Sequence, residues 1–200
     1  MNPQNFWNER YNETELVYGE APNIWMKVCL DARIPGKILF PAEGQGRNAI
    51  YAASRGWEVD AFDFSPVARQ RAMEQADRQK VSIRYQVHQV QDYTPRERYY
   101  DAIGLSYVHL PESIRIPFYE KLIRSLKPGG EIFIEGFTHT QLAYQSGGPR
   151  SEELLYTAAI VTRELSVLQP IYCLETDLVL AEGEYHKGPA HVIRFIGLNA

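Results

Sequence analysis

Short apolar runs alternate with helical patterns along most of this chain. Five apolar runs read as strands, at 38–40, 57–62, 81–87, 101–106 and 131–135. Between several of them, apolar residues recur at helical spacing, over 48–54, 65–78 and 111–126. Strands that alternate with helices favour a mostly parallel sheet covered by helices on both faces.

The pattern changes toward the end of the chain. A helix is predicted over 151–165, with Ser151 as its cap. Two long strand-like runs, 171–180 and 191–198, then flank a glycine-containing turn with no helix between them. Such strands must be antiparallel. The predicted fold is therefore α/β: a doubly wound, Rossmann-like, mostly parallel sheet of seven strands with an antiparallel C-terminal hairpin.

The segment before the first strand is aromatic and polar. Residues 1–20 suit either a lid that closes over a site or an arm packed on the surface. Pro22 then predicts the first turn of a helix. We expect a single domain over 1–200, with an N-terminal helical lid or cap over 1–33 and a core over 36–200.

A glycine-broken turn follows the first strand, in KILFPAEGQGRNAIYAA. The spacing Gly44-x-Gly46-x-x-Ala49 allows a sharp turn, a close ligand approach and helix packing on the strand. The helix N-terminus offers unpaired N–H groups to an anion. By itself the motif also fits an ordinary strand–turn–helix.

Asp63 ends the second strand, 19 positions after Gly44. In a nucleotide-binding α/β fold, an acid there accepts hydrogen bonds from ribose hydroxyls. The alternative is a turn or cap residue. Asp101, at the amino end of its strand, lies at the opposite edge and is interpreted as structural.

Net charge, the length of the apolar runs and the cysteine content limit the classes of protein to which this chain can belong. The net charge of −4 gives no electrostatic footprint for nucleic acid, and no apolar run approaches membrane-spanning length. Cys29 and Cys173 are far apart and lack metal-ligand spacing, so we expect two reduced thiols in a cytoplasmic protein and no metal.

Taken in order, these features resemble a family over nearly the whole chain. The glycine motif, the acid after strand two, the LKPGG turn and the terminal hairpin are similar to those of class I S-adenosylmethionine (SAM)-dependent methyltransferases. More narrowly, GQGRNAIYAA, the HLP triplet at 109–111 and the loop with Gln141 and SGGPR resemble the tellurite-resistance and thiopurine-methyltransferase-like small-molecule group.

The chain departs from the family pattern in the glycine motif. Phe40 replaces the usual acid, Ala42 the first glycine and Glu43 the cysteine, so Glu43 becomes the candidate carboxylate for the methionine amino group. Gln89 aligns with the acid that receives the adenine amino group, and its carbonyl can still accept that bond.

The resemblance implies SAM as cofactor and S-adenosylhomocysteine as product. It implies cofactor contacts from ten residues: Tyr18, Gly19, Glu43, Gly44, Gly46, Asp63, Phe64, Gln89, Val90 and Ser106. Tyr107 and His109 are the catalytic candidates, and Glu135, His139 and His186 are further candidate bases. Substrate-binding candidates are Arg47, His139, Arg150 and His186. For these histidines and arginines, a structural or surface role is the alternative.

No set of residues fixes one general base, which favours a soft acceptor: a thiol, selenium or tellurium species. A nicotinamide-dependent oxidoreductase and a non-catalytic SAM-binding regulatory module remain the alternatives. We expect a small-molecule acceptor, no nucleic acid or membrane partner, and a monomer or homodimer.

Overall fold

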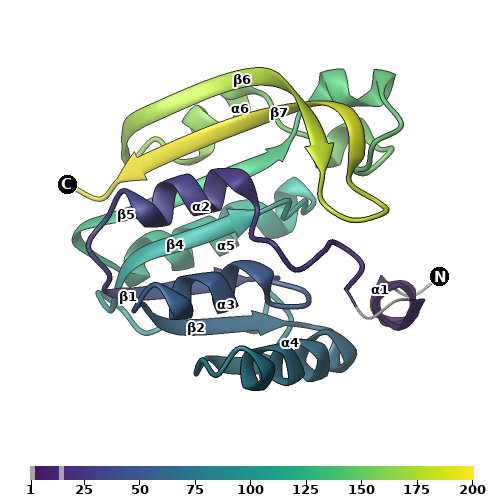
Figure 1. Cartoon of the computed structure of the whole chain (residues 1–200). Coiled ribbons are helices and arrows are strands. Elements are labelled where there is room, and N and C mark those ends of the chain that lie inside the picture. The colour runs from purple at the N-terminus through teal and green to yellow at the C-terminus, as the bar shows by residue number, and fades with distance from the viewer. Residues whose placement is uncertain (1–2, 14–15) are drawn as a thin grey trace.

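The computed structural model describes residues 3–13 and 16–200. These residues form a seven-stranded sheet in the order β3-β2-β1-β4-β5-β7-β6, with helices on both faces (Figure 1). The predicted fold class is therefore confirmed. Residues 1–2 and 14–15, within the predicted lid, lie outside the described residues.

The first five strands run parallel, and β7 pairs antiparallel with both β5 and β6. Their bounds are β1 (Lys37–Pro41), β2 (Glu58–Asp63), β3 (Arg84–Val87), β4 (Tyr100–Ser106), β5 (Leu126–Phe137), β6 (Gln169–Ala181) and β7 (Lys187–Leu198). The predicted KPGG turn is part of β5, whose pairing with β4 shifts register between Tyr100 and Ala102. Because five strands are parallel, their carboxyl ends meet at one edge.

Six α-helices lie in the described residues: α1 (Pro3–Glu13), α2 (Ile24–Asp31), α3 (Arg47–Ser54), α4 (Pro66–Arg78), α5 (Glu112–Ser125) and α6 (Ala158–Glu164). Two short 3₁₀ turns, η1 (His139–Ala143) and η2 (Glu152–Leu154), precede α6. One apolar core lies between the sheet and α2, α3 and α4, and the other lies under α5 and α6. None of these helices is both long and apolar enough to cross a bilayer.

Helix starts follow the side chains that can cap them. Ser65 Oγ accepts from Ala68 N–H at 3.1 Å, so α4 begins at Pro66 as the sequence predicts. The predicted helix start at Pro22 is wrong, because Asn23 is the cap of α2 and its Oδ1 accepts from Met26 N–H at 3.0 Å.

The helix predicted over 151–165 is also wrong in its first half. Tyr156 N–H donates to Phe137 O, and His139 N–H donates to Tyr156 O, so this stretch pairs with the end of β5. Backbone groups used in this bridge are not available to a helix. The helix α6 therefore starts after Thr157, whose Oγ1 accepts from Ile160 N–H.

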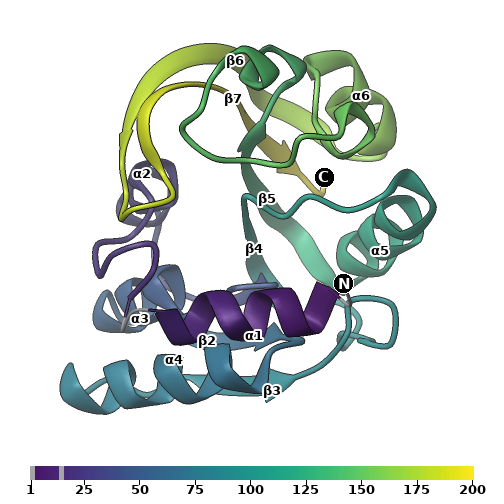
Figure 2. The ribbon, with the colours of Figure 1, turned by 90° about the vertical axis from the view of Figure 1, so that its right-hand side faces the viewer.

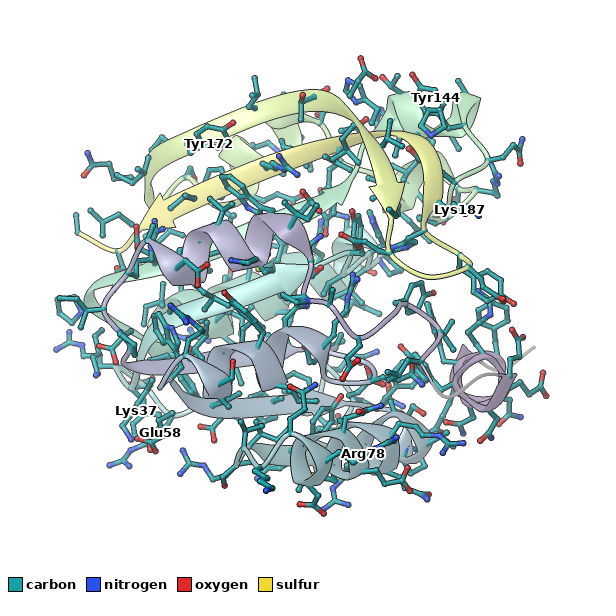
Figure 3. The ribbon with its side chains drawn as sticks, viewed as in Figure 1. Lys37, Glu58, Arg78, Tyr144, Tyr172 and Lys187 are labelled. Carbon is teal, nitrogen blue, oxygen red and sulfur yellow. The ribbon has the colours of Figure 1, made fainter. Side chains whose placement is uncertain are left out.

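The two edges of the sheet differ in chemistry. At the amino edge, Lys37 pairs with Glu58 (Figure 3), and Asp101 binds Lys37 N–H and the Lys127 ammonium. The structural interpretation of Asp101 is thus confirmed. At the carboxyl edge, α1 lies across the ends of the strands, beside the turn that joins β6 and β7 (Figure 2).

The packing of α3 on α4 gives a first prediction. Gly46 has a φ of +84°, and a Cβ there would lie 2.7 Å from Ala72 Cβ. Gly46→Ala should lower the free energy of unfolding by about 2–4 kcal/mol, from left-handed strain plus overpacking. Gly129→Ala is the matched control, since Gly129 has a φ of +79° but open space around it. In urea denaturation, Gly129→Ala should lower the free energy of unfolding by only about 1–2 kcal/mol. Equal losses for the two variants would contradict the packing account.

Candidate functional site

The glycine loop between β1 and α3 is tied to the end of β2. Gly44 N–H donates to Asp63 Oδ2 at 3.0 Å, and Ser65 N–H donates to Asp63 Oδ1 at 2.8 Å. Tyr85 Oη–H donates to Gly44 O at 2.5 Å. Burial raises the pKa of Asp63 to about 6, against the opposing effect of these backbone bonds. One carboxylate thus fixes two loops of the carboxyl edge.

Glu43 fills the N-terminus of α3. Its Oε1 accepts from Asn48 N–H at 2.8 Å and from Ala49 N–H at 2.9 Å. The helix therefore receives its carboxylate from within the chain, three residues after the Phe40 that replaces the family's acid. Burial raises the pKa of Glu43 to about 7.

The helix α1 covers the glycine loop. A Cβ on Gly44 would lie 2.8 Å from Tyr11 Oη, so only glycine lets this ring approach the loop. Two further contacts hold α1 down: Gln4 Nε2 donates to Phe64 O, and Asn8 pairs with Ser65 Oγ. The predicted cofactor residues Gly44 and Phe64 therefore lie directly beneath α1.

The end of β4 brings two predicted residues to the same edge. Ser106 Oγ is buried without a hydrogen-bond partner among the described residues. Tyr107 has a φ of +55°, which is strained for a residue with a side chain. Its hydroxyl donates to Glu135 Oε1 at 2.9 Å, and its ring stacks on Phe137 at 4.6 Å.

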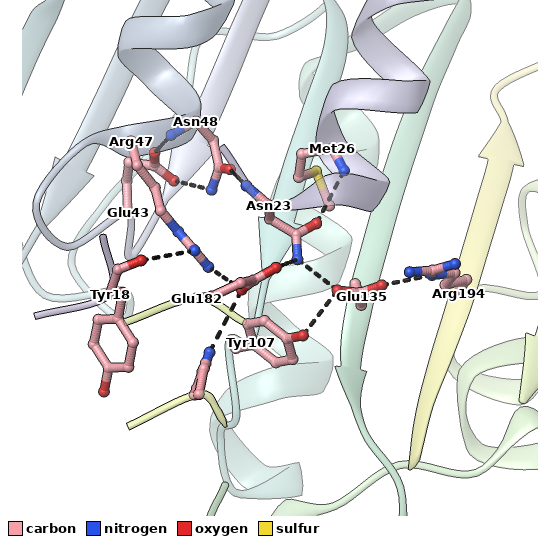
Figure 4. A network of polar contacts seen from close by, with 11 residues as sticks. Tyr18, Asn23, Met26, Glu43, Arg47, Asn48, Tyr107, Glu135, Glu182 and Arg194 are labelled. Carbon is pink, nitrogen blue, oxygen red and sulfur yellow. Dashed lines mark hydrogen bonds and ion pairs between the residues drawn. The ribbon is translucent and has the colours of Figure 1, made fainter. Parts of the chain in front are cut away.

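Glu135, at the end of β5, is the centre of a buried polar network (Figure 4). The side chain is 1% exposed. Besides the Tyr107 hydroxyl, it accepts from Asn23 Nδ2 at 2.5 Å and from Arg194 Nε at 2.6 Å. Its charge is thereby balanced by Arg194 and its oxygens are occupied, which leaves this candidate base in a structural role.

A second carboxylate, Glu182, lies in the β6–β7 turn and joins the same network. Arg47 Nη2 donates to Glu182 Oε2 at 2.7 Å, and Asn23 Nδ2 donates to Oε1 at 3.1 Å. Arg47 Nη1 also donates to Tyr18 O at 3.1 Å. Burial opposes ionisation, but His186 and Arg47 hold the pKa of Glu182 at about 2. Arg47 is therefore paired, and it links the turn to the segment that carries Tyr18.

The predicted catalytic residue His109 is held at both ring nitrogens. Nδ1–H donates to Leu154 O at 2.8 Å, and Phe137 N–H donates to Nε2 at 3.2 Å. Burial lowers the pKa of His109 to about 4. The structure thus favours the alternative, in which His109 fixes the loops around β5.

His186 lies among aromatic rings at the carboxyl edge, against Tyr18 and Tyr107. His139 and Arg150, by contrast, lie in the loop after β5. His139 pairs with Glu152 and lines a groove of about 780 Å³ beside α5, and Arg150 donates to Tyr144 O. No contact between these two side chains and His186 occurs in the described part of the chain.

The predicted adenine residues Gln89 and Val90 follow β3. Asp92 N–H and Tyr93 N–H both donate to Gln89 O, so a backbone turn presents this pair. Val90 packs against the core under α5. Gly19 has a φ of +77°. A Cβ added to Gly19 would lie 3.6 Å from Gly183 N in the hairpin turn.

Sequence reasoning did not assign Tyr11, Asn23, Glu182 or Arg194 to the site. Asn23 caps α2, and Glu182 and Arg194 come from the hairpin, far along the chain from the glycine motif. The aromatic lead-in gave a signal for Tyr11. Nothing in the local pattern around the other three indicates that they meet.

Residues 38–130 match a family model described as a methyltransferase domain. This range runs from β1 to the start of β5 and contains the glycine loop and Asp63. A comparison with curated protein sequences finds no match.

Solved structures share the fold. One, from work on the conversion of a disulfide bond into a thioacetal group during echinomycin biosynthesis, is similar with a TM-score of 0.82 and 18% identity over 98% of this chain and 91% of that one. TehB from Haemophilus influenzae has a TM-score of 0.75 and 15% identity over 98% and 67%. The N-methyltransferase NodS from Bradyrhizobium japonicum WM9, bound to S-adenosylhomocysteine, has a TM-score of 0.72 and 12% identity over 100% and 99%.

Residues 38–130 are therefore similar to a methyltransferase domain, and the chain shares the fold of a SAM-dependent methyltransferase. One residue at the carboxyl edge fits its cofactor: Ser106 Oγ, at the end of β4, is a buried hydroxyl without a partner in the described structure. Hydroxyl groups in this state accept or donate a bond when a polar ligand arrives.

The Glu43 cap predicts a pH dependence of stability. Its folded pKa of about 7 lies above the ordinary value of 4.5, so its contribution is fully present below pH 4.5 and is lost as pH rises through 7. Glu43→Gln keeps an acceptor oxygen and removes this titration. Urea denaturation measures the stability of each protein. The free energy of unfolding of Glu43→Gln minus that of wild type should therefore be larger at pH 8 than at pH 5. An unchanged difference would contradict the burial account.

Proposed function

We propose that this methyltransferase transfers the methyl group of SAM to a small-molecule acceptor through a soft nucleophilic atom, a thiol, selenium or tellurium species. One observation supports this most. The two carboxylates and two arginines beside Tyr107 are paired with each other, Glu135 with Arg194 and Glu182 with Arg47. A neutral acceptor fits such a charge-balanced edge better than an ionic one.

The named relatives differ in the chemistry that their names describe. One solved structure concerns sulfur chemistry on a disulfide, and NodS is an N-methyltransferase. At 12–18% identity these proteins share the fold, and their acceptors differ. The acceptor of this chain therefore rests on its own residues.

The proposal assigns roles at the carboxyl edge. Gly44 and Ser106 lie against the methionine moiety, Asp63 holds the ribose, and Gln89 with Val90 frames adenine. Gly46 allows the turn that positions the loop, and its missing side chain also serves α4. Glu43 acts by capping α3 rather than by touching the ligand. Tyr18 and Gly19, together with Tyr11, close over the site.

A bound sulfonium supplies an activated methyl carbon, so the protein mainly orients the acceptor and excludes water. The contacts of α1 with Phe64 and of the hairpin turn with Arg47 support water exclusion, since both lie on this edge. The proposal includes a cytoplasmic location, consistent with free thiols at Cys29 and Cys173. A monomer or homodimer is expected.

Calorimetric titration of the purified protein with SAM, S-adenosylhomocysteine and NAD tests the cofactor. We expect micromolar binding of the two sulfur nucleosides and no heat from NAD. Binding of NAD alone would instead support the oxidoreductase. Binding of SAM without turnover of any thiol, selenite or tellurite would support a non-catalytic regulatory module.

The ribose assignment predicts a loss of affinity. Asp63→Ala should weaken SAM binding by at least about 1 kcal/mol, the scale of a hydrogen bond to a charged group, measured by the same calorimetry. Asp60→Ala is the control, because Asp60 lies on the same strand but binds Arg84 and Tyr100. If Asp63→Ala folds and binds SAM with the wild-type Kd, Asp63 does not hold the ribose.

A further inference from the structure

The imidazole of His186 is enclosed by aromatic rings from three separate segments. Its centroid lies 4.6 Å from that of Tyr18, 4.5 Å from that of Tyr107 and 5.4 Å from that of Phe137. The residue is only 7% exposed. A ring so enclosed is fixed in place rather than free on a hairpin turn.

Backbone packing fixes the turn itself. A Cβ on Gly183 would lie 2.3 Å from Val17 O, and a Cβ on Gly147 would lie 2.8 Å from His186 Cδ2. Glu182 N–H donates to His186 O at 2.8 Å, which closes the turn. The hairpin turn is therefore packed between the Tyr18 segment and the loop after β5.

The ring has one polar atom in an unusual state. His186 Nδ1 is buried and has no hydrogen-bond partner among the described residues. It lies 3.7 Å from Glu182 Oε2, just beyond hydrogen-bond distance. Buried polar nitrogens are nearly always bonded, and catalytic contacts often tighten only when the substrate binds.

Charges from every neighbouring element act on this ring. Glu182 belongs to its own turn, Arg47 to α3, Glu135 to β5 and His109 to the loop after β4, and Tyr18 and Tyr107 supply hydroxyls. Burial, the largest effect, lowers the pKa of His186, and Arg47 lowers it further, while Glu182 and Glu135 oppose them. The imidazole is therefore neutral at neutral pH. An ionised Glu182 beside Nδ1 favours the tautomer with its proton there, which leaves Nε2 as the basic nitrogen.

We propose that His186 is the general base of the methyl transfer, with Glu182 as its positioning residue, and that the acceptor is a protonated thiol. Three rings around the imidazole suit sulfur, which makes favourable contacts with aromatic side chains. Arg47 and Arg194 are each paired with a carboxylate, so neither offers a free positive charge to a thiolate. This inference rests on the proposed function and adds the identity of the base and the protonation state of the acceptor.

The proton and electron balance is simple. The thiol gives its proton to His186 Nε2. The thiol sulfur forms a bond to the methyl carbon as the carbon–sulfonium bond breaks, and that electron pair leaves with S-adenosylhomocysteine. One cation, the sulfonium, is replaced by one imidazolium, which the Glu182 carboxylate stabilises. Solvent then removes the proton.

The test compares two thiols at pH 7.5: an alkanethiol, which is protonated, and an arenethiol, which is ionised. His186→Gln should lower kcat for the alkanethiol by about 100-fold or more and for the arenethiol by less than about fivefold. SAM affinity by calorimetry should stay at the wild-type value. His191→Gln is the control, since His191, which lies in β7, bonds to Thr138 after β5, and it should leave both rates unchanged.

A second measurement needs neither SAM nor acceptor. In SAM-free protein, the Cε1 proton resonance of His186, followed by NMR across pH, should titrate at lower pH in Glu182→Gln than in wild type. The reason is that the variant removes the anion that stabilises the imidazolium. An unchanged titration would contradict the role of Glu182.

The outcomes separate this inference from the proposed function. Equal losses for both thiols, no loss for either, or a wild-type protein that binds SAM but methylates neither thiol would each overturn the base assignment alone. Failure of the wild-type protein to bind SAM would overturn the proposed function, and the base assignment with it.

Discussion

The hydrogen bond from Gly44 N–H to the Asp63 carboxylate holds the rest of the site in place. It joins the loop after β1 to the end of β2, and the same carboxylate binds Ser65 N–H at the start of α4. Parallel pairing brings these strand ends to one edge, and this buried acid then ties the two loops to each other. The cover formed by α1 depends on it, because Tyr11 packs on Gly44 and α1 contacts Phe64 and Ser65.

Buried carboxylates recur along this edge, and each is stabilised in a different way. Glu43 accepts from helix N–H groups, Glu135 pairs with Arg194, and Glu182 pairs with Arg47. An unpaired charge at such depth costs several kcal/mol. The pairing ties α3, β5 and the hairpin turn to one another, so distant parts of the chain share one network. It also leaves few free charges toward an acceptor, which connects the packing to the proposed chemistry.

Much of the fold could be predicted from periodicity and turn residues, because strands that alternate with helices allow few topologies. The helix expected from Ser151 failed, since a tertiary bridge between Tyr156 and β5 overrides the local preference for helix. The glycine loop and Asp63 stand out as motif residues. The Glu182–Arg47 pair could not be predicted from the sequence, because the two residues lie 135 positions apart and meet only through the antiparallel hairpin. Likewise, the histidine before Leu-Pro looked catalytic, although both its nitrogens bind backbone.

The central claim is that one site at the carboxyl edge, closed by α1 and the hairpin turn, takes the cofactor. Backbone hydrogen exchange with and without SAM tests it most directly. We expect SAM to slow exchange in the glycine loop at 44–48 and at 63–65 after β2. We expect the same in the closing segments: α1, the residues 17–19 that follow it, and the hairpin turn at 183–186. Protection confined to the groove beside α5, with these segments unchanged, would contradict the account.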